Sequence, residues 1–268
     1  MSTFVLVHPA WLGGWCWRKI VPLLAAHGHE VHTPTLTGLG ERAHLARPDV
    51  DLHTHVTDVV EMLEFGDLRE VVLAGNSSAG MVITGVAERV PDRVAELVYV
   101  DAFVPQDGQC LFDLVPPDRR ALMEGLVQTE GDGWLLPRFA PPPWAEFVPR
   151  SWEVTDPDDL AWMLPRLRPT PAKHFTTPLP LGNPAAARLP RSYIRSIRWP
   201  HPGFDRFAET AEREPGWRLR RLDASHLAYV TSPTDLASVL LELVAPANAE
   251  PALVKPATRA GETRNSRR

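Results

Sequence analysis

One short segment carries the clearest chemical signal in the sequence. The apolar run Val71–Ala74 leads into Gly75-Asn76-Ser77-Ser78-Ala79-Gly80, and a helical pattern begins at once. A strand that turns sharply into a helix around Gly-x-Ser-x-Gly/Ala lifts the serine hydroxyl above the sheet, where it can act as a nucleophile. Gly75 and Ala79 supply the small residues that such a strained turn needs on either side. We therefore predict Ser77 as the nucleophile and regard Ser78 as the poorer candidate.

A serine hydroxyl needs a general base, and the chain has 10 histidines. In chains with this turn the order is Ser, acid, His, and the histidine follows the last strand. His226 comes directly after the predicted strand Trp217–Leu222 and the linker Asp223-Ala224-Ser225. We predict His226 as the base. His174 and His201, in the Pro-rich region, are weaker candidates for contact with a ligand.

An oxyanion formed at the serine needs two N–H donors. The start of the helix after Ser77 provides one donor, the backbone N–H of Ser78, together with the positive end of the helix dipole. The loop after the first strand, His8-Pro9-Ala10-Trp11-Leu12-Gly13-Gly14, should provide the other. Because Pro9 has no N–H, we predict Ala10 as the second donor.

The elements that must position these residues alternate between strands and helices. The strands are apolar runs and not alternating patterns, which favours a mostly parallel, doubly wound α/β sheet covered on both faces. The predicted strands are Thr3–His8, His29–Pro34, Arg69–Gly75, Ala95–Asp101, Ser192–Ile197 and Trp217–Leu222. The predicted helices are Gly14–His27, Leu52–Glu64, Gly80–Val90, Phe204–Glu212 and Pro233–Val244.

Proline is distributed unevenly, since 18 of the 28 prolines lie between Pro105 and Pro202. This region shows no strand rhythm, and an insertion of this length must form a subdomain of its own. We predict a core of residues 1–104 and 191–245 and a helical, Pro/Trp-rich cap at 105–190. Insertions at the carboxyl ends of parallel strands lie over ligand sites. We therefore expect Trp134, Trp144 and Trp162 of this region to contact the substrate. We expect the same of Trp11, which lies in the loop after the first strand.

Composition excludes several classes of protein. The net charge of −5 and pI of about 6.1 do not suggest a nucleic-acid partner. No apolar run is long enough to span a membrane, and no signal peptide is apparent at the start. Two cysteines, Cys16 and Cys110, make no disulfide framework, so we expect a cytoplasmic protein. The polar, basic tail 246–268 is expected to be disordered, and a homodimer is left open.

With these residues in view, the chain resembles α/β-hydrolase-fold esterases of the plant methylesterase and hydroxynitrile lyase group and their bacterial relatives. The resemblance spans Phe4 to about Val244. It rests on the segments His8–Trp17, Thr35–Arg42, Gly75–Gly80, Asp101–Pro105, Ser192–Arg195 and Ser225-His226. It implies a Ser/His/acid hydrolase with a small cap and with no cofactor or metal. It also implies the α/β-hydrolase fold.

Several positions depart from that group. Its turn usually reads Gly-His-Ser-Tyr/Leu-Gly-Gly, whereas this chain has Asn76, Ser78 and Ala79, which bears on substrate range. The resemblance implies that hydroxynitrile lyases of the group carry a Thr where this chain has Pro9, and a Lys immediately after the catalytic histidine. This chain has Pro9 and Leu227, so the resemblance favours ester hydrolysis over lyase chemistry.

The acid is the least certain member of the predicted triad. The group usually places it after the strand that matches Ser192–Ile197, but the first carboxylate there is the distant Asp205. Asp101, at the carboxyl end of the strand after the nucleophile helix, is our first choice because some α/β hydrolases place the acid there. Asp205 is the second choice, followed by Asp223 or no acid at all.

Together these observations predict a serine hydrolase that cleaves a carboxylic ester through an acyl-enzyme. The tryptophan-rich cap favours a hydrophobic or aromatic small molecule as substrate, in a natural-product tailoring step for example. Two alternatives remain open at this point: a non-catalytic ligand-binding protein on the same scaffold, and a lyase that breaks a C–C bond.

Overall fold

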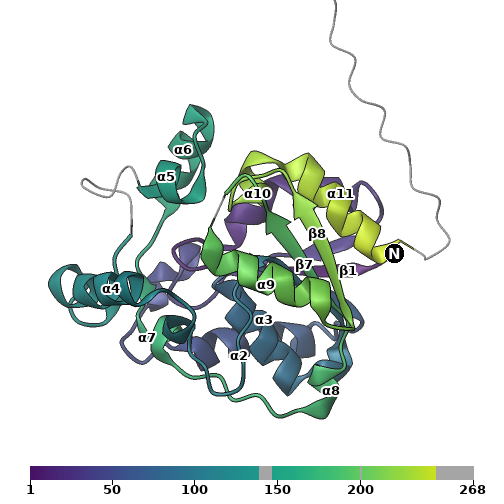
Figure 1. Ribbon diagram of the computed structural model, residues 1–268, viewed down its shortest axis with the longest axis horizontal. Helices are drawn as coiled ribbons and strands as arrows, with labels where there is room; N and C mark the ends of the chain where they lie inside the picture. Colours follow the sequence, from purple (N-terminus) through teal and green to yellow (C-terminus); the bar gives the residue numbers. More distant parts are fainter. Residues whose placement is uncertain (139–146, 200, 246–268) are drawn as a thin grey trace, which may run out of the picture.

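A parallel sheet forms the centre of the molecule. The computed structural model describes residues 1–138, 147–199 and 201–245, and a six-stranded sheet runs through them in the order β2-β1-β3-β4-β7-β8 (Figure 1). All neighbouring strands of this sheet are parallel. The strands are β1 (Thr3–Val7), β2 (Glu30–His32), β3 (Val71–Ser77), β4 (Val94–Ala102), β7 (Arg191–Ser196) and β8 (Trp217–Leu222).

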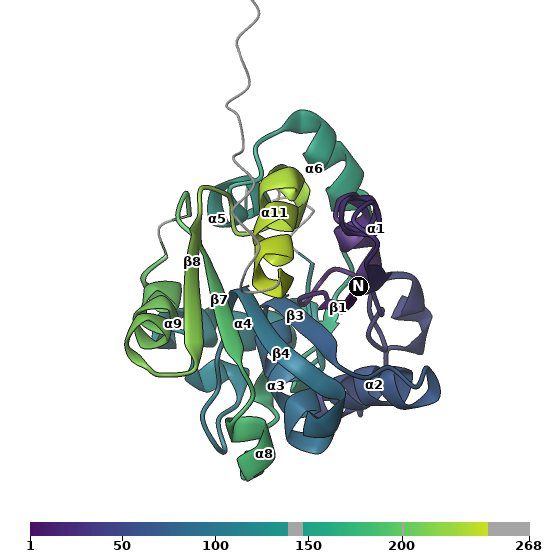
Figure 2. The same ribbon diagram turned by 90° about the vertical axis from the view of Figure 1, so that its right-hand side faces the viewer.

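Helices cover both faces of the sheet, as the near-continuous burial of β1 and β3 requires. Helices α1 and α11 contact each other on one face, while α2, α3 and α9 pack on the other (Figure 2). The main helices of the core are α1 (Val21–Ala25), α2 (Leu52–Phe65), α3 (Ala79–Arg89), α9 (Pro202–Arg213), α10 (Ala228–Thr231) and α11 (Pro233–Val244). The shorter 3₁₀ turns are η1 (Gly14–Lys19), η2 (Gly40–Leu45), η3 (Pro91–Arg93), η4 (Leu111–Asp113) and η6 (Leu164–Arg166).

The strand order reverses at β1, which lies between β2 and β3. In open α/β sheets, ligands bind outside the carboxyl ends of the strands at such a point. The loop after β1 and the turn after β3 meet there. The topology alone therefore brings the predicted oxyanion loop next to Ser77.

Two predicted elements are broken or much shortened in the structure, whereas the other predicted strands and helices begin and end within two residues of the predicted bounds. The segment Gly14–His27 is not one helix but the 3₁₀ turn η1 followed by the short helix α1. Pro22 explains the break, because a proline can start a helix but lacks the N–H that a helix interior needs. Strand β2 stops at His32, since Pro34 cannot donate to the sheet.

The segment between β4 and β7 is helical, as expected, but it also contains strands. Its elements are α4 (Pro117–Glu130), β5 (Leu135–Leu136), α5 (Phe147–Trp152), α6 (Pro157–Met163), β6 (Thr170–Pro171), α7 (Lys173–Thr176) and α8 (Pro184–Ala187). The sequence of this region shows no strand rhythm, yet the structure contains one antiparallel pair, β5 and β6. Strands of two residues are too short to give a period that the sequence could reveal.

The last part of this segment leaves the carboxyl end of the sheet. Helix α8 packs on α3 and η3, far from α5 and α6 in Figure 1. In the described part of the chain, no helix is both long enough and apolar enough to span a membrane. The tail 246–268 and Trp144, both named in our predictions, lie outside the described residues.

Candidate active site

Ser77 occupies a sharp turn between β3 and α3. Its φ is +54°, in the left-handed region of backbone conformation that residues other than glycine seldom adopt. Two glycines allow the turn. A Cβ on Gly75 would lie 2.9 Å from the carbonyl oxygen of Ala79, and one on Gly80 would lie 1.9 Å from that of Phe103. The strand, the turn and the helix thus lie where the sequence pattern predicts them.

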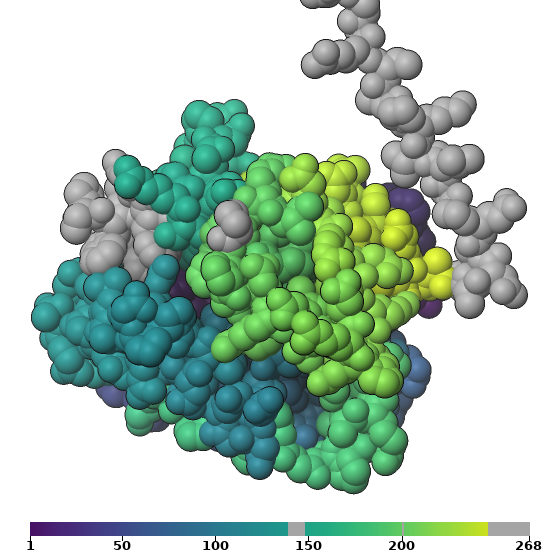
Figure 3. All heavy atoms as spheres, viewed as in Figure 1, coloured from purple at the N-terminus to yellow at the C-terminus, as the bar shows by residue number. Residues whose placement is uncertain are grey.

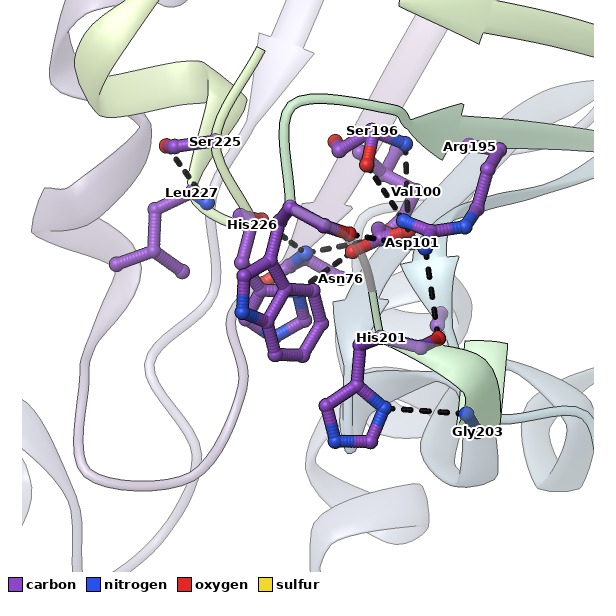
Figure 4. A network of polar contacts seen from close by, with 12 residues as sticks. Asn76, Val100, Asp101, Arg195, Ser196, His201, Gly203, Ser225, His226 and Leu227 are labelled. Carbon is purple, nitrogen blue, oxygen red and sulfur yellow. Dashed lines mark hydrogen bonds and ion pairs between the residues drawn. The ribbon is translucent and has the colours of Figure 1, made fainter. Parts of the chain in front are cut away.

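His226 and Asp101 form a buried pair. His226 Nδ1 lies 2.7 Å from Asp101 Oδ2, and both side chains are almost inaccessible to solvent. His226 stands on the loop after β8, and Asp101 lies near the end of β4. Figure 4 shows His226 and Asp101 side by side in a network of polar contacts. Because Nδ1 is directed at the carboxylate, Nε2 is the ring nitrogen left for a group in the cavity that His226 lines. A carboxylate in this place fixes the orientation and tautomer of an imidazole.

The other two candidate acids lie elsewhere. Asp205 Oδ1 accepts a hydrogen bond from Arg195 Nε at 2.9 Å, and its side chain is 54% exposed. Asp223 is exposed and pairs with Arg198 at 3.3 Å. Of the three carboxylates weighed from the sequence, Asp101 is therefore the one that contacts His226.

Arg195 is a residue of the site that sequence reasoning missed. Its buried guanidinium donates to Asp101 Oδ1 at 2.9 Å through Nη1 and to the carbonyl oxygen of Trp199 at 2.9 Å through Nη2. Burial lowers the pKa of Arg195, but the carboxylates of Asp101 and Asp205 outweigh this effect, so the pKa is raised. Five consecutive residues of β7 are buried, so neither face of the strand is open to solvent, and the sequence could not show that this arginine points into the protein.

Asn76 holds the loop that carries His226. Its amide nitrogen donates to the carbonyl oxygens of Val100 at 2.8 Å and of His226 at 3.1 Å. Its amide oxygen accepts from the Tyr229 hydroxyl at 3.1 Å. Because all the hydrogen bonds are made inside the protein, this buried polar side chain fixes the backbone of His226 instead of destabilising the core. The sequence signal that could have revealed this role of Asn76 is the presence of a polar residue near the end of an otherwise apolar strand.

The loop after β1 is held rigidly. The backbone N–H of Leu36 donates to His8 Nε2 at 3.0 Å, so His8 Nδ1 carries the proton and donates to the carbonyl oxygen of Pro9 at 2.8 Å. Burial lowers the pKa of His8 to about 4, which keeps the ring neutral. The Pro9–Ala10 peptide is thereby fixed. The Ala10 N–H donates to Ser78 Oγ at 2.8 Å, so the predicted oxyanion donor already has a partner.

An aromatic cavity that opens to solvent joins these residues. Residues of the segment between β4 and β7 line it together with residues that follow the strands of the sheet, and a recess beside α9 marks the place where these parts of the surface meet (Figure 3). In the described chain, no hydrogen bond joins the Ser77 hydroxyl to His226, although both line the cavity. Such bonds often shorten only when substrate binds. The principal lining residues are Trp11, Ser77, Ser78, Phe103, Arg119, Trp152, Phe175, Trp199, Phe204 and His226.

The tryptophans that we expected to contact the substrate lie in different places in the structure. Trp11 lines the cavity, and its ring lies 5.9 Å from that of Trp152, a liner that sequence reasoning did not select. Trp134 lines a different hollow, beside Lys173. Trp162 packs on Trp15 with ring centroids 5.1 Å apart. Neither Trp134 nor Trp162 is among the residues that line the cavity at Ser77. The prediction failed for these two residues because the sequence of this region did not show which way each side chain faces.

No metal-binding cluster was expected. Within residues 1–138, 147–199 and 201–245, no group of three or more His, Cys, Asp or Glu side chains is arranged to hold a metal ion. The hydroxyl, imidazole and guanidinium side chains that line the cavity are those of Ser77, Ser78, Arg119, Ser151, His201 and His226.

Comparison with known proteins places this chain in a family. The sequence profile described as the alpha/beta hydrolase family matches residues 4–239. This chain is an α/β hydrolase. It is 38% identical over 247 residues to the carbendazim hydrolyzing esterase of Nocardioides sp. (strain SG-4G), an alignment that covers 91% of this chain and all of that protein. The predicted family, fold class and kinship with ester hydrolases are confirmed.

Solved structures agree with this α/β hydrolase over most of its length. A pyrethroid hydrolase from Sphingobium faniae JZ-2 is 27% identical with a TM-score of 0.70, covering 90% of this chain and 96% of that one. An extracellular α/β hydrolase from a Paenibacillus species has a TM-score of 0.79 at 24% identity, covering 90% and 98%. The latter likeness supports the fold alone.

Proposed function

We propose that this α/β hydrolase cleaves carboxylic esters through an acyl-enzyme on Ser77, with His226 as general base and Asp101 as the acid that orients it. The observation that carries the proposal is the 2.7 Å contact between His226 Nδ1 and Asp101 Oδ2 at the wall of the cavity that Ser77 also lines. Ser77, His226 and Asp101 would then act as the nucleophile, the base and the orienting acid of a serine triad.

The chemistry runs in two halves. Ser77 Oγ attacks the ester carbonyl while its proton passes to His226 Nε2, and the carbonyl π electrons move to oxygen. When the tetrahedral intermediate collapses, His226 gives that proton to the leaving alcohol. A water molecule then attacks the acyl-enzyme with the same help from His226, and the acid product leaves with Ser77 restored.

The substrate class follows from the wall of the cavity. Trp11, Trp152 and Trp199 surround the space above Ser77, and Phe175 and Phe204 complete it. Flat aromatic groups stack favourably on such rings. We therefore propose esters with an aromatic acyl or alcohol part. The similar proteins described as carbendazim and pyrethroid hydrolases are compatible with this choice.

Two measurements on the purified protein test the proposal. Hydrolysis of a 4-nitrophenyl ester should be lost in Ser77→Ala, while circular dichroism shows an unchanged fold. A fluorophosphonate probe should label Ser77 in the native protein and not in the variant. Turnover that survives in Ser77→Ala would contradict the proposal. Tight ligand binding without labelling or turnover would instead indicate a non-catalytic binding protein.

A cytoplasmic location is part of the proposal. Cys16 and Cys110 are buried and unpaired, and unpaired cysteines are usual in reducing compartments. Fractionation of the producing cells with an antibody against the protein tests this. Enrichment in the medium would contradict it.

A further inference from the structure

The hydroxyl of Ser78 is hydrogen-bonded to one of the two N–H groups that are expected to bind an oxyanion. The Ala10 N–H and the backbone N–H of the residue after Ser77 are the two donors that the fold directs at the reacting carbonyl. In this chain, the Ala10 N–H donates to Ser78 Oγ at 2.8 Å. Both residues are buried, with Ser78 only 3% exposed. A side chain of the site thus uses one of the two expected donors.

The Ala10 N–H cannot turn away easily. Its peptide plane is fixed by the hydrogen bond from His8 Nδ1 to the Pro9 carbonyl oxygen. The next N–H in the chain, that of Trp11, donates at 2.8 Å to Thr170 Oγ1 on strand β6. For a substrate oxygen to reach the Ala10 N–H, the bond to Ser78 Oγ would have to break. The buried hydroxyl would then lose a donor, which costs free energy.

The Ser78 hydroxyl has one donor of its own. A serine oxygen accepts through its lone pairs and donates one proton, so accepting from Ala10 leaves the O–H available. Among the described residues, the Ser78 O–H has no hydrogen-bond acceptor, and Ser78 lines the same cavity as Ser77 and His226. A hydroxyl that accepts a hydrogen bond also becomes a stronger donor, because bonds in a chain polarise one another.

We propose that the Ser78 side chain is a catalytic hydrogen-bond donor, with its O–H replacing the Ala10 N–H in the oxyanion hole and Ala10 acting on it from behind. This inference rests on the proposed esterase function of Ser77. The oxyanion receives two bonds from one residue, the N–H and the O–H of Ser78. No proton is transferred to it, because the proton of Ser77 goes to His226 Nε2 and Ser78 keeps its own.

The alternative is a hydroxyl that merely occupies the hole and must be displaced. The two cases give opposite results in Ser78→Ala. If the hydroxyl donates to the oxyanion, kcat on 4-nitrophenyl butyrate should fall about 10²- to 10³-fold with KM little changed, as for the loss of one oxyanion donor. If the hydroxyl is only an obstacle, kcat should stay the same or rise, and that result overturns the proposal.

A transition-state analogue separates this role from a structural one. An aryl trifluoromethyl ketone forms a tetrahedral oxyanion adduct on the nucleophile, so its Ki should rise in Ser78→Ala by about the factor lost in kcat. Ser78→Thr keeps the hydroxyl and should keep Ki and kcat within about tenfold. Ser78→Cys, a weak donor, should lie between Thr and Ala. An unchanged Ki in Ser78→Ala, or equal losses in all three variants, would overturn the proposal.

Two controls keep this test apart from that of the proposed function. Ser238→Ala removes an exposed hydroxyl on α11, which donates to the Thr234 carbonyl oxygen, and should leave kcat and Ki unchanged. Fluorophosphonate labelling of Ser77 should persist, more slowly, in Ser78→Ala. Absence of labelling in the native protein would instead mean that the proposed nucleophile is wrong.

Discussion

Arg195 Nη1 lies 2.9 Å from Asp101 Oδ1, and both side chains are buried, 4% and 0% exposed. The same carboxylate receives His226 on its other oxygen and the Ser196 N–H at 3.2 Å on this one. A buried carboxylate is stable only when it is paired and fully hydrogen-bonded. Arg195 therefore provides the buried carboxylate of Asp101 with a paired cation and a hydrogen bond, and Asp205 contacts that arginine from its exposed side.

The first prediction concerns this ion pair. Arg195→Met should lower the free energy of unfolding by about 3–5 kcal/mol, because it leaves Asp101 buried without its cation. Urea denaturation measures the change. Arg213→Met, which removes an exposed partner of Glu209 on α9, is the matched control and should cost less than about 1 kcal/mol. Equal losses in the two variants would show that the buried pair does not stabilise the fold.

The second prediction decides between the two candidate acids. Asp101→Asn should lower kcat about 10⁴-fold, because an amide no longer holds the imidazole in the required state. Asp205→Asn should change kcat by less than about tenfold, since Asp205 reaches His226 only through Arg195. Steady-state kinetics on one chromogenic ester measures both. The reverse order of effects would assign the acid to Asp205.

The third prediction concerns selectivity in the cavity. Trp152→Ala should lower the ratio of kcat/KM for an aromatic over an aliphatic ester about tenfold, because a stacking partner beside Trp11 is lost. A ratio is insensitive to any loss of folded protein. Trp162→Ala is the matched control, because Trp162 packs on Trp15 outside the cavity. A shift of the ratio by the control and not by Trp152→Ala would contradict the substrate assignment.

The fourth prediction follows from a buried pair of histidines. His55 Nε2 donates to the Thr37 carbonyl oxygen, so His55 Nδ1 accepts from His174 Nδ1 at 2.9 Å. His174 Nε2 is buried and has no hydrogen-bond partner among the described residues. Burial lowers the pKa of both rings below the ordinary value of 6.5. Each ring is therefore neutral in the folded protein.

The sign of the pH effect follows. Below about pH 6.5 the unfolded chain binds protons at these histidines and the folded protein does not, so stability should fall as pH drops from 7.5 to 5. Urea midpoints across this range measure the slope. His174→Gln should make it shallower, whereas His44→Gln, at an exposed ring, should leave it unchanged. A slope that His174→Gln does not alter would contradict the assignment.

Local pattern was enough for much of this protein. The strand Trp217–Leu222 and the helix Pro233–Val244 have the predicted bounds, because apolar periodicity and proline set them within a few residues of chain. The turn at Ser77 was equally readable, since a strained φ restricts its neighbours to small residues. The break at Pro22 was missed because helical spacing continues across it.

Long-range contacts decided the rest. The sequence by itself determined the sheet, the nucleophile turn and the place of His226 after the last strand, all of which depend on neighbouring residues. Only the tertiary structure decided that Asp101, 125 residues from His226, is the carboxylate in contact with it. It also decided that Ser78 meets Ala10 across 68 residues. Hydrogen bonds between distant segments depend on how loops pack, and no local spacing encodes that packing.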